Sequence, residues 1–464
     1  MIFASHIFIF GFLPLFLAAY YLVPARFRSL LILLASYAFY GWWRVDYLAL
    51  VIAISLISYV SATIAATAVD QKRKALAVRS GITLILCALG YFKYAHFIVG
   101  MTNGLTESFG AAAFTMNTII LPIGISFLSF QSISYIIDVA RKDAPPARSL
   151  VDFLAFVALF PQLIAGPVLR YKDLAAQFLE RTHSVEKFTF GVQRFVTGLA
   201  MKLLVADTVA PLSDRVFALA EPSLAEAWLG ATAYAVQLFF DFAGYSAMAI
   251  GLGLMIGFKF VENFDQPYAS QSVTEFWRRW HISLSNWLRD YLYVPLGGNR
   301  NGTLKTYRNL ILTMVLGGLW HGANWTFILW GGWHGTALAL ERLAGMKPGG
   351  RQLPFRLGWP VTMMIVLIGW VMFRAPNVGQ AFDIYGGMIG LNGWALSSQF
   401  QYATQSVELL ALCVGGCLST LDLKNRVLFD RLTPPRSATT VALFLVSSLA
   451  LSARTHTPFL YFQF

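Results

Sequence analysis

The chain has 464 residues, of which 57% are hydrophobic and only 12% are charged, and its mean hydropathy is +0.60. Soluble domains carry about 25% charged residues, so the composition excludes a soluble fold and indicates an integral membrane protein. The net charge of +12 comes largely from short loops between apolar runs, which favours orientation in a membrane over nucleic-acid binding.

Twelve apolar runs approach or exceed the length needed to cross about 30 Å of hydrocarbon. The runs are continuously apolar, and some are broken by Gly and Pro. We therefore expect an all-α polytopic fold of about eleven to thirteen helices, not all of them full crossings. The first run lacks a basic n-region and a cleavage site, so it is expected to remain as a span. The runs lie at 7–23, 29–43, 47–69, 76–98, 119–139, 150–168, 191–217, 228–256, 309–340, 357–373, 405–421 and 438–453.

Basic residues in four loops predict the orientation of the chain. By the positive-inside rule these loops face the cytoplasm, so both termini face outward, which in a bacterium is the periplasm. The segments 170–190 and 257–308 break the alternation, because they would lie outside and yet are basic. We expect re-entrant or in-plane helices there, lining a cavity. The four loops contain Lys72, Arg73, Lys74 and Arg79; Arg141, Lys142 and Arg148; Arg342, Lys347, Arg351 and Arg356; and Lys424, Arg426, Arg431 and Arg436.

Two histidines in membrane-like sequence are the candidate catalytic residues. His321 stands in L-G-G-L-W-H-G-A-N-W, where glycines allow a backbone or ligand to approach closely. Ionisable side chains at membrane depth are costly and by default functional. An imidazole can accept a proton from an attacking hydroxyl, so His321 is a candidate general base. Core packing is the alternative role for a single histidine.

His281 follows the block W-R-R-W. If this segment is one helix, Trp277, His281 and Ser285 share a face and could point into a cavity. The nearby Asp290 could pair with one of the arginines. The alternative is an interfacial helix whose tryptophans and arginines belong to the membrane belt.

Asp241 is an acid inside an apolar run and needs a buried partner. We expect Tyr245 or an arginine from 278–289 to supply it, with Asp241 in a supporting role. A metal site built from His281, His321 and His334 is disfavoured, because no Cys, Asp or Glu stands beside them at ligand spacing; we expect no metal.

The chain ends in T-P-F-L-Y-F-Q-F, at 457–464. From the residues alone, Tyr461 is an interfacial anchor.

Four motifs together resemble the membrane-bound O-acyltransferase (MBOAT) family, and within it the bacterial alginate O-acetyltransferase branch. The resemblance spans nearly the whole chain. Its motifs are P-Q-L-I-A-G-P at 161–167, D-F-A-G-Y-S-A-M-A-I-G at 241–251, F-W-R-R-W-H-I-S-L-S-N-W-L-R-D-Y-L-Y-V-P-L-G-G-N-R at 276–300 and L-G-G-L-W-H-G-A-N-W at 316–325.

The resemblance implies one membrane domain over 1–464, with its core at about 119–345. It also implies a ring of transmembrane and re-entrant helices around a central funnel. The family's invariant histidine falls on His321 and its second active-site histidine on His281. The C-terminal pattern F-x-Y-x-x-F makes Tyr461 a candidate acyl relay. The substrate-binding residues expected around these three are Trp280, Ser285, Asn286, Asp290, Asn324 and Asp241.

The implied function is O-acyl transfer at a bacterial inner membrane. A thioester donor, acetyl-CoA, enters from the cytoplasm, where basic side chains suit its phosphates; no further cofactor is expected. The acetyl group passes to a periplasmic acetyltransferase and then to an exported polysaccharide such as alginate. The alternative is a transporter or flippase for an acylated or lipid-linked glycan that makes no bond. Transporters commonly have two similar halves, whereas here the polar residues concentrate at 241–334.

Overall fold

The computed structural model describes residues 1–110, 112–163, 166–346, 354–421, 433–453 and 460. These residues form helices and no strand, and six of the helices are long and apolar enough to cross a membrane. The expected all-α polytopic membrane protein is thereby confirmed. The six are Asp46–Thr67, Gln71–Ser108, Val185–Phe217, Leu224–Met255, Arg356–Arg374 and Pro434–Ala453, and the shorter apolar helices are Ile7–Leu22, Leu150–Leu163 and Ser406–Thr420.

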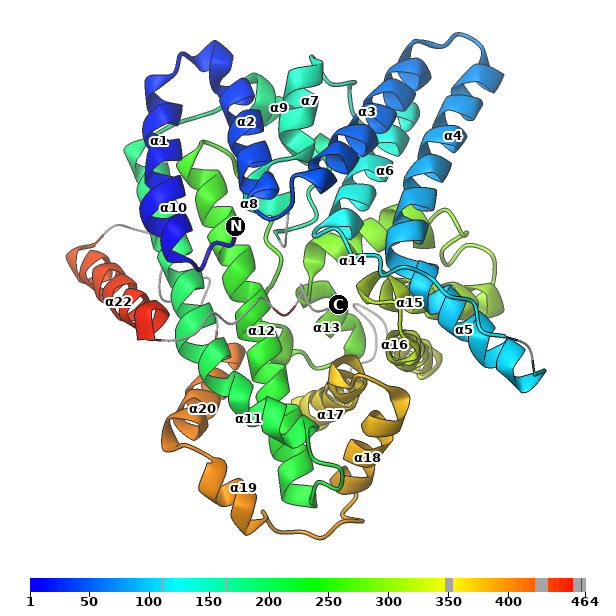
Figure 1. The fold of residues 1–464 in the computed structure, drawn as a ribbon, viewed down its shortest axis with the longest axis vertical. Helices are drawn as coiled ribbons and strands as arrows, with labels where there is room; N and C mark the ends of the chain where they lie inside the picture. The colour runs from blue at the N-terminus through cyan, green and yellow to red at the C-terminus, as the bar shows by residue number, and fades with distance from the viewer. Residues whose placement is uncertain (111, 164–165, 347–353, 422–432, 454–459, 461–464) are drawn as a thin grey trace. The chain divides into compact units, whose positions relative to one another are not determined.

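The chain divides into two compact units, of which the first comprises 1–192 and 249–261. In this unit α3, α4 and α6 pack against one another (Figure 1). Gly81 of α4 permits the contact, because a Cβ there would collide with the Ser61 side chain of α3. The helices of this unit are α1 (Leu13–Leu22), α2 (Arg28–Gly41), α3 (Asp46–Thr67), α4 (Gln71–Leu89), α5 (Ala95–Ser108), α6 (Ile125–Arg141), α7 (Leu150–Val157), α8 (Phe160–Leu163) and α9 (Tyr171–Leu179).

The second unit comprises 193–248 and 262–464 and holds both candidate histidines. Two helices, α10 (Val185–Ala200) and α12 (Leu224–Met255), contribute residues to each unit. The other helices of the second unit are α11 (Asp207–Phe217), α13 (Val273–Arg279), α14 (Ile282–Leu288), α15 (Thr303–His321), α16 (Trp325–Leu343), α17 (Phe355–Arg374), α18 (Val378–Met388), α19 (Ser398–Ala403), α20 (Ser406–Thr420) and α22 (Pro434–Ala453).

Two expected helices are interrupted in the second unit. The run 309–340 is two helices, because α15 ends at His321 and the Asn324 side chain caps the start of α16 by accepting from the Thr326 N–H. A single helix over 276–290 is wrong: α13 and α14 are separated at Trp280 and His281. The short helices between 262 and 302 lie outside the six candidate spans.

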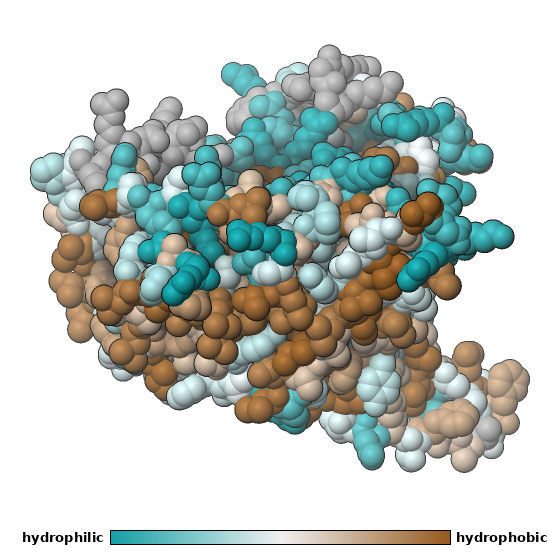
Figure 2. Space-filling view, turned by 90° about the horizontal axis from the view of Figure 1, so that it is seen from above, coloured by the Kyte–Doolittle hydropathy of each residue, from teal (hydrophilic) through white to brown (hydrophobic). Residues whose placement is uncertain are grey.

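The surface has the character of a lipid-facing protein. Figure 2 shows many hydrophobic side chains exposed on the displayed face. Large apolar side chains are exposed on apolar helices, for example Leu22 at 84% and Leu449 at 70%, and exposed apolar patches of this extent mark contact with lipid or a partner. The ring around a funnel, the single domain over 1–464 and its core at 119–345 stay predictions.

Candidate active site

His281 occupies the break between α13 and α14. Its backbone is in the left-handed region, with φ 44° and ψ 54°. A non-glycine residue adopts this conformation at a cost of roughly 1–3 kcal/mol, and such residues cluster at functional sites. The conformation ends α13 and starts α14 in a new direction, which a helical face prediction does not anticipate.

The His281 imidazole is enclosed by aromatic rings. The side chain is 1% exposed, and its ring centroid lies 4.7 Å from that of Phe242 and 6.2 Å from that of Trp320. Nδ1 lies 3.0 Å from the Asn263 Oδ1 atom, while Nε2 has no hydrogen-bond partner among the residues that the structure describes. His281 lies outside the six candidate spans, and its burial lowers the pKa of the imidazole to about 3, so the ring is neutral near pH 7.

His321 is the last residue of α15 and is 6% exposed. Aromatic rings pack on it, with centroid distances of 5.2 Å to Trp330 and 5.1 Å to Phe373. The ring centroid of Trp320 lies 5.0 Å from that of His321 and 6.2 Å from that of His281. The structure therefore brings the two candidate histidines, 40 positions apart in the chain, against the same tryptophan.

Close packing of α15 on α16 fixes the position of His321. Three glycines have no room for a Cβ: one at Gly318 would meet the Phe327 carbonyl, one at Gly331 the backbone around Met314, and one at Gly335 the backbone of Ile311 at 2.7 Å. Glycine is required there because the two backbones approach directly. Gly318, one of the glycines that the sequence pointed to, thus serves helix packing beside the histidine, together with Gly331 and Gly335 of α16.

Asp241 belongs to a buried cluster of charges. Lys202 Nζ lies 2.9 Å from Asp241 Oδ1 and 2.6 Å from Asp207 Oδ1, and the three side chains are at most 6% exposed. The Leu460 N–H donates to Asp241 Oδ2 at 2.9 Å. The expectation of an arginine from 278–289 as partner is wrong; the cation is Lys202. A lysine inside the apolar run 191–217 was the sequence signal that could have found it.

The remaining expected site residues differ in their surroundings. Trp280 is buried, with its ring centroid 4.9 Å from that of Trp370. Ser285 Oγ donates to the Trp280 carbonyl at 3.3 Å. Asp290 forms a surface pair with Arg289. Asn286 is half-buried.

Asn324 caps α16, and its Nδ2 donates to the Pro376 carbonyl at 2.8 Å. Tyr461 lies outside the described residues. His334 is buried against Trp277 and Trp330. Within the described part of the chain, no three His, Cys, Asp or Glu side chains are grouped to hold a metal ion.

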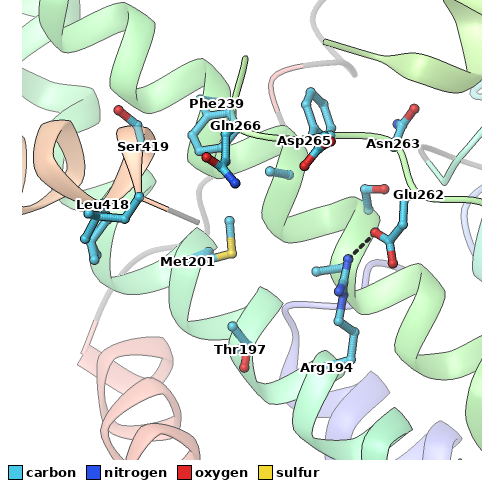
Figure 3. Close-up of a pocket in the computed structure, with 15 residues that line it drawn as sticks. Arg194, Thr197, Met201, Phe239, Glu262, Asn263, Asp265, Gln266, Leu418 and Ser419 are labelled. Carbon is cyan, nitrogen blue, oxygen red and sulfur yellow. Dashed lines mark hydrogen bonds and ion pairs between the residues drawn. The ribbon is translucent and has the colours of Figure 1, made fainter. Parts of the chain in front are cut away.

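A pocket in the second unit was not anticipated. Figure 3 shows Arg194 of α10 paired with Glu262, at 2.5 Å, with Asn263 near Glu262 and Gln266 next to Phe239. Phe239 is part of its apolar wall. The loop 262–266 borders this pocket, and it also contains Asn263, which contacts His281.

Comparison with known proteins gives the family. Residues 140–347 match the model of the MBOAT, membrane-bound O-acyltransferase family. The chain is 50% identical over the full length of both chains to a protein of Azotobacter vinelandii named probable alginate O-acetylase AlgI. It is also 34% identical to a peptidoglycan O-acetyltransferase of Helicobacter pylori, with 100% of this chain and 98% of that protein covered.

A more distant relative is the teichoic acid D-alanyltransferase of Streptococcus thermophilus, at 29% identity over 54% of this chain and 68% of that protein. These relatives are all acyl-transferring enzymes by name. The chain belongs to the membrane-bound O-acyltransferase family, in its alginate O-acetylase-like branch, and is a multi-pass membrane O-acetyltransferase.

Proposed function

We propose that the protein takes an acetyl group from acetyl-CoA on the cytoplasmic side of a bacterial inner membrane and passes it outward for O-acetylation of an exported polysaccharide such as alginate. The observation that carries this proposal is the placement of His281 and His321 against Trp320, inside the segment that matches the family model. The relatives named for alginate and peptidoglycan O-acetylation support a secreted glycan as final acceptor.

His321 is the proposed general base. A hydroxyl oxygen attacks the thioester carbonyl carbon, its proton passes to His321, and the carbon–sulfur bond breaks. The thiolate leaves as the free thiol of CoA after taking up a proton, so atoms and charge balance. A base of this kind is worth about 10² to 10⁴ in rate.

Tyr461 is the proposed first acceptor, which would hold the acetyl group as a phenolic ester. A periplasmic acetyltransferase would then move the acetyl group to the polysaccharide. The Leu460 N–H, one residue before Tyr461, bonds to Asp241 in the second unit. This contact supports the proposal because it places Leu460, the neighbour of Tyr461 in the chain, in the same unit as the two histidines.

Ser285 and Asn324 are the proposed donors toward the oxyanion that forms at the thioester carbonyl. Such donors act by being aimed in advance at the charge that develops. Both donors have partners in this structure. Ser285 is the stronger candidate, because its hydroxyl donates to the Trp280 carbonyl at 3.3 Å, a longer and more easily exchanged bond than the 2.8 Å bond from Asn324 Nδ2 to the Pro376 carbonyl. His281 orients the reacting groups, and Trp280, Asn286, Asp290 and Asp241 support the substrate site.

The basic loops give the proposed orientation. The loop between α3 and α4 and the start of α4 contain Lys72, Arg73 and Lys74, so they face the cytoplasm and both termini face the periplasm. Acetyl-CoA would approach from the side that carries these charges. The transporter alternative gains no support, since the relatives are transferases by name.

The test is His321→Ala in cells that export the acetylated polysaccharide. We expect polysaccharide acetylation to fall by about 10²-fold or more while the amount of membrane-inserted protein stays the same. Acetylation near the wild-type level, in membranes with equal protein, would remove His321 from the base position. The control is Gly332→Ala on α16, a position with no atom within 4 Å of an added Cβ.

A further inference from the structure

The backbone at His281 is held by the loop 262–265. The Ile282 N–H donates to the Asn263 carbonyl at 2.9 Å, and the Asp265 N–H donates to the Arg279 carbonyl at 2.9 Å. These two bonds flank the left-handed residue on both sides. The loop therefore stabilises a conformation that His281 would not adopt by its own preference.

The Asn263 side chain continues this contact. Its Oδ1 accepts from the Ser283 N–H at 3.3 Å and from the Ser283 hydroxyl at 2.8 Å. A backbone N–H can only donate, so the atom that faces Ser283 must be the amide oxygen. The hydrogen bonds from Ser283 therefore decide the orientation of the Asn263 amide: its oxygen, and not its nitrogen, faces His281.

The tautomer of His281 follows from this arrangement. Nδ1 lies 3.0 Å from the same Asn263 Oδ1. An oxygen that only accepts requires a donor opposite it, so Nδ1 carries the proton. In a neutral imidazole the other nitrogen, Nε2, then holds a lone pair.

The surroundings keep His281 in this state. The rings that face it, Phe242 of α12 and Trp320 of α15, carry no titratable group. Asn263, from the loop, is neutral. Nε2 is buried and has no partner among the described residues, so it is the atom left to meet a substrate.

We propose that Asn263 is a positioning residue: it fixes His281 with its proton on Nδ1, so that Nε2 can accept a hydrogen bond from a donor group of the bound substrates and cannot donate one to an oxyanion. The catalytic part of this inference rests on the function proposed above. It narrows the role of His281 and leaves oxyanion stabilisation to other donors. Sequence alone gives no such signal, because Asn263 precedes His281 by 18 positions in an irregular loop.

The direct test is ¹⁵N NMR of the wild-type protein labelled at histidine and reconstituted in lipid. The His281 signals are identified by their loss in His281→Gln. We expect a protonated Nδ1 and an unprotonated Nε2 near pH 7. A proton on Nε2, or a doubly protonated ring, would overturn the inference whatever the enzyme's activity, so this result is separate from any failure of the proposed function.

Two substitutions of Asn263 test its effect on the reaction. Asn263→Ala removes the acceptor, and we expect kcat to fall by about 10²-fold and the His281 ring to lose its single tautomer. Asn263→Asp keeps an acceptor oxygen in the same place and should retain activity within about tenfold. The added negative charge raises the pKa of His281, so loss of activity on acidification should begin at higher pH than in the wild type.

A structural role alone predicts a different pattern. Asn309 is a matched control: it is equally buried, but its Nδ2 donates to the Leu296 and Gly298 carbonyls and not to the site. Asn309→Ala should lower thermal stability and leave the His281 ring signals unchanged. If Asn263→Ala keeps wild-type kcat, or if Asn263→Asp leaves the pH profile unmoved, Asn263 does not act through His281.

Discussion

Lys202→Met tests whether the charges around Asp241 form one buried network. Lys202 lies between Asp207 and Asp241 and pairs with both, and these three groups by themselves sum to a formal charge of −1. Removing the lysine leaves two buried carboxylates at −2. Breaking a buried pair in this way costs about 3–5 kcal/mol, because the remaining charge is uncompensated.

Asp207→Asn gives the matched comparison. It leaves Lys202 paired with Asp241, and these two charges cancel, so the loss is that of one charged hydrogen bond, about 1.5–3 kcal/mol. The triple change Lys202→Met, Asp207→Asn, Asp241→Asn removes every charge and should recover much of the stability lost in Lys202→Met, since apolar or neutral replacements of buried ion networks are often tolerated.

The assay is thermal unfolding in detergent, followed by tryptophan fluorescence, at fixed pH and lipid content. We expect the apparent Tm to fall most in Lys202→Met, less in Asp207→Asn, and to rise again in the triple variant. A Tm for Lys202→Met equal to that of the wild type would refute the network. So would a greater loss in Asp207→Asn than in Lys202→Met.

Three further outcomes are expected. Gly331→Ala should destabilise the protein by about 1–3 kcal/mol, because the added methyl group would overpack against Met314. Gly332→Ala, where an added Cβ meets open space, should be neutral or stabilising by up to about 1 kcal/mol. Equal Tm values for the two variants would contradict the close packing of α15 on α16. The pKa of His281 is lowered to about 3, so the contribution of its neutral ring to stability is full above the unfolded pKa of about 6.5 and is lost as the pH falls toward 3. The wild type should therefore lose more stability than His281→Gln between pH 7 and pH 4. Parallel curves of Tm against pH for the two proteins would contradict this. Tyr461→Phe keeps the ring and removes only the hydroxyl, so polysaccharide acetylation should be lost if Tyr461 is the relay, and full acetylation would make it an anchor.

Hydropathy located the six candidate spans, because each of them overlaps one of the twelve expected apolar runs. Each expected run contains helix where the structure describes it, because a continuous apolar stretch in lipid must satisfy its backbone internally. The division of 309–340 at Gly322 was missed, although the signals were present: a glycine followed by Asn324, a good N-cap residue. The sequence stays apolar on both sides of such a break, so a hydropathy profile cannot show it.

The site was predictable only in part. His281 and His321 stood out because histidines are rare in apolar sequence, and the structure places both against Trp320. Lys202 and Asn263 were missed. Lys202 contacts Asp241 and Asn263 contacts His281, and both contacts join residues that are far apart in the chain. Such contacts depend on the tertiary fold, which hydrophobic periodicity and helix propensity do not reveal.

The left-handed backbone of His281 was missed for a related reason. Helical spacing assumed that Trp277, His281 and Ser285 share a face, and that assumption fails wherever one residue leaves the helical region. The conformation depends on two backbone hydrogen bonds: the Ile282 N–H donates to the Asn263 carbonyl, and the Asp265 N–H donates to the Arg279 carbonyl. A single sequence contains no sign that a loop will supply them.

The most direct measurement follows an acetyl group labelled in acetyl-CoA through purified protein in liposomes. With acetyl-CoA supplied on the side of the basic loops, the wild type should transfer label to the protein or to an added periplasmic acceptor. The His321→Ala variant, reconstituted in equal amount, should transfer about 10²-fold less or lower. Label that stays on CoA with the wild type, or that moves equally well with His321→Ala, would contradict the account.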